Sequence, residues 1–217
     1  MKLTLDDSRR LTGANLHWDH PSAIIDVSIE GSPELVVAAW RRATEYWLAK
    51  VGYAEEQTFV RLFDGGASLL ISAPIDVLYS MCELNEVAWA SAVADVTGDT
   101  GPDESEQFPR LNRLFDDERN PPLLALQEAA HHHRVPFLWD DDEVSLGFGA
   151  SSEVFTPDNL PAVDDVDWSR YQSIPVAMVT GTNGKSTTVR MTASIMSAAG
   201  LRAGLTSTDF IRVGDRV

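Results

Sequence analysis

The order of apolar and polar side chains in the first thirty residues predicts one loop and one strand. Residues 9–30 begin without a regular pattern, and apolar and polar positions then alternate from Ala23 to Glu30. Ile25, Val27 and Ile29 fall on one face, because successive side chains of a strand point to opposite sides. We therefore expect an opening loop followed by a half-buried strand.

Two longer stretches have the period of a helix. The first begins at Ser32-Pro33-Glu34, which supplies an N-cap, a proline in the first turn and an acid near the positive end of the helix. We expect this helix to stop near Gly52. The second stretch opens at Pro74 and continues to about Val96.

Between these helices lies a hairpin signal. Thr58 to Leu62 and Ala67 to Ser72 are short β runs on either side of Asp64-Gly65-Gly66. The first hundred residues therefore predict the order β-α-β-β-α, which is typical of a small α+β domain.

The residues from 98 to 173 form several segments that differ in composition and in expected secondary structure. Residues 98–120 are polar and acidic, and we interpret them as a turn and surface loop. Residues 121–133 predict a third helix, and residues 135–148 a second hairpin around an acidic turn. Prolines and aspartates in residues 156–173 indicate an interdomain linker.

The most informative stretch follows this linker. Apolar residues from Pro175 to Val179 predict a short buried strand, a loop with Gly181 and Gly184 comes next, and a helical pattern begins at Lys185. Strand, glycine loop and helix start form a phosphate cradle, because loop N–H groups point into one concavity and the helix dipole adds positive charge. In such a loop Lys185 reaches the β- and γ-phosphates and a following hydroxyl coordinates Mg²⁺.

The loop departs from the common G-x-x-x-x-G-K-[ST] pattern, since position 179 is a valine and the first glycine is Gly181. The string from Val179 to Thr187 resembles the variant loop of the Mur ligase superfamily. That superfamily includes the folylpolyglutamate synthetases and the C-terminal half of cyanophycin synthetase. A chance glycine turn between a strand and a helix is the alternative.

Other segments resemble cyanophycin synthetases more weakly. Arg10 to Trp18 is similar to the opening of that family, and the hairpin ending at Gly149 is similar to the one that there precedes an ATP-grasp domain. No ATP-grasp domain follows in this chain. The resemblance therefore implies a cyanophycin-synthetase-like Mur ligase that lacks the ATP-grasp domain.

The resemblance implies ATP and Mg²⁺ as cofactors and Lys185 as the catalytic residue. The residues that it assigns to ATP are Thr180, Gly181, Thr182, Asn183, Gly184, Lys185, Ser186 and Thr187. It assigns the metal to Ser186 and to a hydroxyl after the next expected strand, Ser207 or Thr208. A plain turn role is the alternative for these last two residues.

Together these patterns predict an α/β protein with an N-terminal α+β domain at 1–155, a linker at 156–173, and the first β-α-β of a P-loop Mur-type central domain at 174–217. The residues after Lys185 suffice for about one βαβ unit, whereas a doubly wound nucleotide fold needs several. We therefore expect an N-terminal portion of a ligase that is catalytically incompetent alone.

The resemblance implies an ATP-dependent ligase that joins a carboxylate to an amino group through an acyl phosphate. Its substrates would be a carboxylate and an amine, each amino-acid or peptide-like. Two alternatives stay open: a non-catalytic binding module that uses the N-terminal domain, and an unrelated P-loop nucleotide-binding protein. The absence of a guanine-reading Asn-Lys-x-Asp run disfavours the GTPase form of the latter.

Charge and composition argue against nucleic acid and membranes as partners of this protein. Acidic residues outnumber basic ones 33 to 17, and a formal charge of −16 repels nucleic acid and anionic membranes, so neither is an expected partner. Met1 to Arg10 lacks the apolar core of a signal peptide, and no run approaches the roughly 18 apolar residues of a membrane span. We expect a cytoplasmic protein, and homo-oligomerisation is left open.

Several residues that could suggest a metal, catalytic or ligand site have structural interpretations. Adjacent helical side chains point about 100° apart, so His131, His132 and His133 cannot converge on one metal ion, and a solvated helix end is favoured. Glu83 and Glu86 share a helix face that we expect to be solvated. The three tryptophans in helical stripes and the lone cysteine are assigned to the core: Trp40, Trp47, Trp89 and Cys82.

Overall fold

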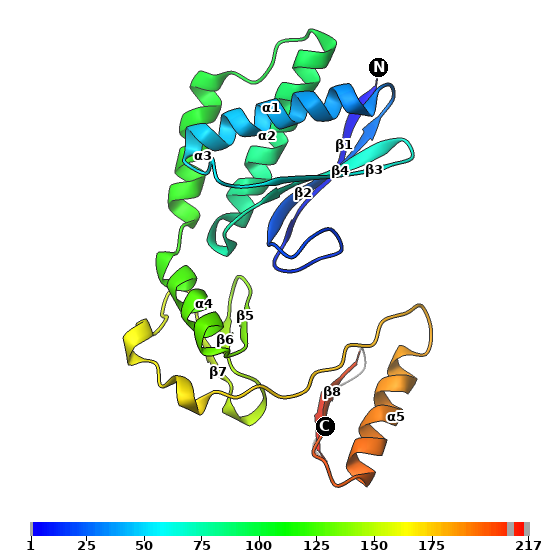
Figure 1. The fold of residues 1–217 in the computed structure, drawn as a ribbon, viewed down its shortest axis with the longest axis vertical. Helices are drawn as coiled ribbons and strands as arrows, with labels where there is room; N and C mark the ends of the chain where they lie inside the picture. The colour runs from blue at the N-terminus through cyan, green and yellow to red at the C-terminus, as the bar shows by residue number, and fades with distance from the viewer. Residues whose placement is uncertain (1, 208–210, 215–217) are drawn as a thin grey trace. The chain divides into compact units, whose positions relative to one another are not determined.

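The computed structural model describes residues 2–207 and 211–214 of the chain (Figure 1). The chain divides into two compact units, Met1–Ser173 and Ile174–Val217. Both contain helices and strands, so the predicted mixed α/β character is confirmed. No helix in the described ranges has the length and apolar character needed to cross a bilayer.

The first unit is built around a four-stranded antiparallel sheet in the order β1-β2-β4-β3. Its strands are β1 (Leu3–Leu11), β2 (Ser22–Ile29), β3 (Thr58–Phe63) and β4 (Gly66–Ser72). The alternating strand and the first hairpin are thus confirmed. The strand β1 was not predicted, and the loop expected to open at residue 9 begins only after Leu11.

Two long helices, α1 (Pro33–Val51) and α2 (Leu78–Thr97), cover one face of this sheet (Figure 1). Both helices were predicted. Trp40 is fully buried, and its indole N–H donates a hydrogen bond to the Asn85 side-chain oxygen at 2.9 Å. The Asn85 amide donates in turn to the Leu69 carbonyl of β4 at 3.2 Å. The buried side-chain amide of Asn85 is therefore well satisfied, as burial of a polar group requires.

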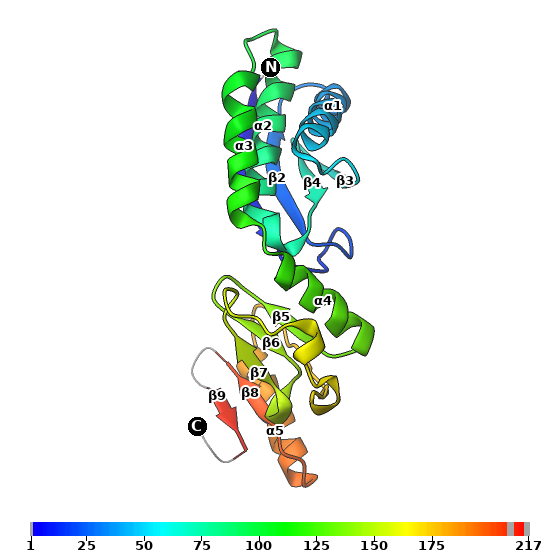
Figure 2. The same ribbon diagram turned by 90° about the vertical axis from the view of Figure 1, so that its left-hand side faces the viewer.

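The segment interpreted as a loop at residues 98–120 is mostly a helix, so that prediction was wrong. Helix α3 spans Glu104–Glu118 and packs beside α2 (Figure 2). The Asp103 carboxylate caps it by accepting the Ser105 N–H at 2.9 Å, and Leu111 and Phe115 are buried. The prediction gave too much weight to the acidic residues and to Pro109 within the helix, and it overlooked apolar residues at helical spacing.

A second hydrophobic cluster completes the first unit. It gathers around helix α4 (Pro121–His133) and a three-stranded sheet of β5 (Phe137–Trp139), β6 (Val144–Leu146) and β7 (Glu153–Phe155). The helix and the hairpin of β5 and β6 were predicted, whereas β7 was not.

Residues 2–173 of the first unit also contain four short 3-10 turns: η1 (Ile75–Val77), η2 (Gly149–Ser151), η3 (Val163–Asp165) and η4 (Trp168–Arg170). The last two lie in the stretch predicted as a linker. That stretch packs against the second cluster, where Tyr171 is buried and the Trp168 ring stacks on His133 with 4.8 Å between ring centroids.

The second unit holds helix α5 (Lys185–Ala198) and an antiparallel pair, β8 (Gly204–Thr206) and β9 (Ile211–Val213). The helix was predicted, but residues 175–179 form no strand, and within 174–207 and 211–214 no parallel strand pair flanks the helix. A parallel strand is held by neighbours on its edges, and β8 pairs with β9 instead. Met178 is consequently 95% exposed rather than buried.

Candidate nucleotide-binding site

Two glycines determine the backbone conformation of the loop before α5. Gly181 has a φ of 141° and Gly184 a φ of 81°, both in the region that side chains disfavour. A Cβ at Gly184 would meet no atom within 4 Å, so the requirement for glycine there is conformational and not one of space. Gly184 is the residue that turns the loop into the helix.

The first turn of α5 presents an uncapped N-terminus. Gly184 provides no side-chain cap, and the first turn contains no acidic residue. The Thr188 N–H donates a hydrogen bond to the Gly184 carbonyl at 2.9 Å, which closes the first turn of the helix. The leading N–H groups and the positive end of the dipole therefore face outward, which is the arrangement that favours an anion.

Lys185 is the first residue of α5, and its side chain folds back over the loop. Its ammonium group donates to the Gly181 carbonyl and, at 3.4 Å, to the Thr182 carbonyl. The side chain is exposed and lies on the same short bend as the free helix N-terminus. The one lysine of this unit is thus held over the loop by backbone carbonyl groups.

The remaining predicted ATP-binding residues lie around this bend. Ser186 is half-buried, whereas the other side chains of the loop are exposed: Thr180, Thr182, Asn183 and Thr187. No described carboxylate forms an ion pair with Lys185.

The predicted metal-binding hydroxyls are Ser186, Ser207 and Thr208. Ser207 is half-buried and directly follows β8, which packs along α5 through Ala193 and Leu205 (Figure 1). Thr208 lies outside the described residues. Ser186 lies in the first turn of α5, and Ser207 directly follows β8.

The three histidines and the acidic run of residues 140–143 have structural roles. The three histidines lie in the exposed last turn of α4, as expected. The acidic run after β5 is a tight turn, in which Asp140 accepts the N–H groups of Asp142 and Glu143 at 3.0 and 2.8 Å. Across the described ranges, no three His, Cys, Asp or Glu side chains are grouped to hold a metal ion.

Comparison with known proteins gives short matches to one kind of enzyme. The cyanophycin synthetase of Geminocystis herdmanii (strain PCC 6308) is 43% identical over 63 residues, 29% of this chain and 6% of that protein. The cyanophycin synthetase of Crocosphaera subtropica (strain ATCC 51142 / BH68) is 48% identical over 42 residues, 19% of this chain and 5% of that protein. No protein-family model matches the chain.

These matches support a likeness to an ATP-dependent ligase family and extend no further than that. The chain aligns with less than a tenth of the length of either relative. The activity, substrates and partners of such an enzyme are therefore matters for proposal.

Proposed function

We propose that residues 179–187 bind the phosphates of ATP with Mg²⁺, and that the chain serves an ATP-dependent ligase. The ligase would join a carboxylate to an amino group through an acyl phosphate. The observation that carries the proposal is the left-handed Gly184 immediately before Lys185, which leaves a free helix N-terminus beside a lysine ammonium. The short matches to cyanophycin synthetases support the reaction class.

The chemistry of this reaction explains why such a bend is useful. Transfer of a phosphoryl group depends on positioning and on neutralising the charge that spreads over its oxygens. The backbone N–H groups at the start of α5 and the Lys185 ammonium together supply that neutralisation. For this, the ammonium exchanges its two carbonyl acceptors for phosphate oxygens, which are stronger partners because they are ionised.

Serine hydroxyl groups supply the oxygen ligands that a magnesium ion prefers. Mg²⁺ prefers oxygen ligands and is usually bound by few protein groups together with water and nucleotide phosphates. Ser186, half-buried at the first turn of α5, is the residue best placed to hold it, and Ser207 would add a second oxygen. The ion would neutralise charge on the phosphates.

The substitution Lys185→Ala tests the lysine. Loss of one charge-assisted contact is expected to weaken binding of Mg²⁺-ATP by about ten- to a hundredfold. Binding is measured by isothermal titration calorimetry on the whole chain. Lys2→Ala is the matched control, since it removes an exposed lysine of the first unit and should leave affinity unchanged. Equal affinity of Lys185→Ala and the unaltered chain would remove the lysine from the phosphate site.

The substitution Ser186→Ala separates the metal from the phosphates. It should weaken binding of Mg²⁺-ATP more than binding of ATP in the presence of a chelator, because only the former uses the hydroxyl as a metal ligand. Equal losses in the two titrations would show that Ser186 does not coordinate the ion.

A further inference from the structure

The four-stranded sheet of the first unit ends in two edge strands, β1 and β3, which differ in character (Figure 2). The pairing of β1 with β2 has a bulge between Leu5 and Asp7, and β1 carries four charged residues: Asp6, Asp7, Arg9 and Arg10. Charges and bulges of this kind hinder the addition of a further strand. The β1 edge is therefore protected against pairing.

Strand β3 has none of these protective features. Its sequence, Thr-Phe-Val-Arg-Leu-Phe, is rich in β-branched and aromatic residues and contains no proline, and its register with β4 is continuous. Arg61 is the one charged residue of this strand. Leu62 and Phe63 are 51% and 45% exposed. A regular, apolar and exposed edge of this kind favours pairing with another strand.

The hydrogen bonds between β3 and β4 show which backbone groups of β3 remain free. The Ser72 N–H of β4 donates to the Gln57 carbonyl at 2.9 Å. Since hydrogen-bonded residues alternate along an antiparallel pair, every second residue from Gln57 directs its N–H and C=O groups toward β4. The remaining residues, Thr58, Val60 and Leu62, direct theirs toward the open edge, where no described strand pairs with them.

This edge is complementary to itself. Two antiparallel copies related by a twofold axis at Val60 place Val60 opposite Val60 of the second copy, and Thr58 opposite its Leu62. These are hydrogen-bonded pairs, so they use the free N–H and C=O groups of both strands. Val60 lies on the face of the sheet that packs on the helices, and Leu62 shares that face because it is two residues away. The valines and leucines of both copies would thus form one apolar strip.

The charged residue of β3 favours this register. Arg61 is exposed and has no hydrogen bond or ion pair with any described residue. With the axis at Val60, Arg61 lies opposite Phe59 of the second copy, where a guanidinium group and an aromatic ring attract each other. An axis at Arg61 would instead place two guanidinium groups opposite each other, which is destabilising.

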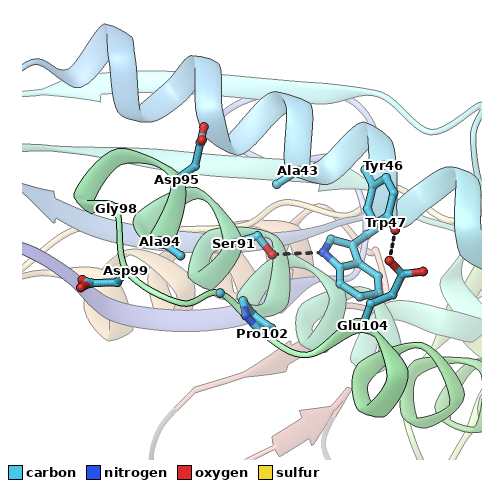
Figure 3. Close-up of a pocket in the computed structure, with 11 residues that line it drawn as sticks. Ala43, Tyr46, Trp47, Ser91, Ala94, Asp95, Gly98, Asp99, Pro102 and Glu104 are labelled. Atoms are coloured by element: carbon cyan, nitrogen blue, oxygen red, sulfur yellow. Dashed lines mark hydrogen bonds between the residues drawn. The ribbon is translucent and has the colours of Figure 1, made fainter.

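The hollow lined by α1, α2 and the residues before α3 provides a contrast (Figure 3). Basic side chains beside it are paired within the chain, since Lys50 pairs with Glu104 at 2.7 Å and Arg42 with Asp95 at 2.8 Å. The charged pairs of that surface are complete in one copy of the protein. The guanidinium group on the β3 edge gains its partner only in the paired arrangement.

We propose that β3 is a homodimer interface, at which the β3 strands of two chains pair antiparallel about a twofold axis at Val60 and join their two sheets into one. A second copy is favoured over an unrelated extended peptide, because the pairing satisfies the backbone groups, the exposed leucine and the arginine of both strands at once. The proposal is independent of the nucleotide site.

Sedimentation velocity of the whole chain over a wide range of concentration measures the association. We expect a monomer–dimer equilibrium that shifts toward the dimer at higher salt, since two chains of net charge −16 repel each other. Leu62→Lys should raise the dissociation constant of the dimer by about tenfold, because both copies then carry a lysine on the pairing edge. Leu138→Lys is the matched control, since it changes a 55% exposed leucine of β5 in the other sheet, and it should leave the dissociation constant unchanged.

Cysteine cross-linking tests the register. Val60→Cys should give a covalent dimer on mild oxidation, because hydrogen-bonded pairs of antiparallel strands have Cα atoms about 5.5 Å apart, within the range of a disulfide. Arg61→Cys should not, because each residue 61 lies diagonal to its own copy, with Cα atoms about 7–8 Å apart. The unaltered chain, with Cys82 as its one cysteine, controls for other cross-links.

Three results would overturn the proposal. They are a chain that stays monomeric at every concentration, a dimer that Leu62→Lys weakens no more than Leu138→Lys does, and cross-linking of Val60→Cys no more efficient than that of Arg61→Cys. If Leu62→Lys does not fold, as judged by its thermal unfolding, Arg61→Ala takes its place. That variant removes an exposed side chain together with its contact to Phe59 of the second copy, and it should also weaken the dimer.

Discussion

The two units differ in how their structure is held. In the first unit, α1 and α2 pack on a sheet whose two middle strands are almost entirely buried. Among the described residues of the second unit only Ala193, Ala203 and Leu205 are buried, and Val176, Met191 and Ile195 are each more than 60% exposed. The nucleotide-binding bend therefore depends on glycine conformation and local hydrogen bonds, whereas the first unit depends on its core.

The largest expected effect uses one residue type in both units. Leu84 is fully buried in α2, and Leu201 of the second unit is 57% exposed. Leu84→Ala should reduce the free energy of unfolding of the first unit by about 2–5 kcal/mol, because it leaves a cavity. Leu201→Ala should change the free energy of unfolding of the first unit by less than about 0.5 kcal/mol, because the Leu201 side chain is mostly exposed and belongs to the second unit.

Chemical denaturation followed by tryptophan fluorescence measures both effects, since all six tryptophans lie in the first unit. A loss for Leu201→Ala as large as that for Leu84→Ala would remove the distinction between the units.

A smaller effect concerns backbone strain at the end of α4. Arg134 has a φ of 56°, the one positive value among the described non-glycine residues. Arg134→Gly should stabilise the first unit by about 0.5–1 kcal/mol, because glycine adopts this conformation at no steric cost. The same denaturation experiment checks it, and destabilisation would show that the arginine side chain contributes more than the strain costs.

The smallest effect depends on pH. Burial raises the pKa of Glu56, although the Ser72 hydroxyl donates to this carboxylate. For an acid with a raised folded pKa, the charged form destabilises the fold above that pKa, and the penalty disappears as pH falls below the unfolded value of about 4.3. Glu56→Gln should therefore be slightly more stable at pH 7 and equal to the unaltered chain near pH 3.5.

Thermal unfolding measured between pH 3.5 and pH 8 provides the comparison. An advantage of Glu56→Gln that persists undiminished at the acid end would assign it to packing instead of charge.

The sequence predicted those elements whose pattern is local and whose partners lie nearby. Helices α1, α2 and α4 and the hairpin of β3 and β4 have clear periodicity and strong end signals. Strand β1 was missed because Asp6, Asp7, Arg9 and Arg10 hide its alternation, and its pairing with β2 bulges between Leu5 and Asp7. Charged edge strands of this kind resist unwanted pairing, and for that reason they do not resemble typical strands.

Helix α3 and the second unit show two other limits. Phe108, Leu111 and Phe115 have helical spacing, and this signal would have found α3 despite Pro109. At 175–179 the apolar run is real, but a strand depends on its neighbours and cannot be read from its own residues.

For the candidate site, the sequence predicted the helix start at Lys185. It did not predict that the lysine ammonium folds back onto the Gly181 and Thr182 carbonyls. That contact depends on the path of the loop backbone, which no residue pattern specifies.

The central claim is that the bend at residues 179–187 holds the phosphates of a nucleotide. The most direct test records the backbone amide NMR signals of Gly184, Lys185 and Ser186 in the whole chain during titration with Mg²⁺-ATP. We predict saturable shifts of these signals, with far smaller changes in β2 and β4. Unchanged signals at these three residues in excess Mg²⁺-ATP would contradict the claim.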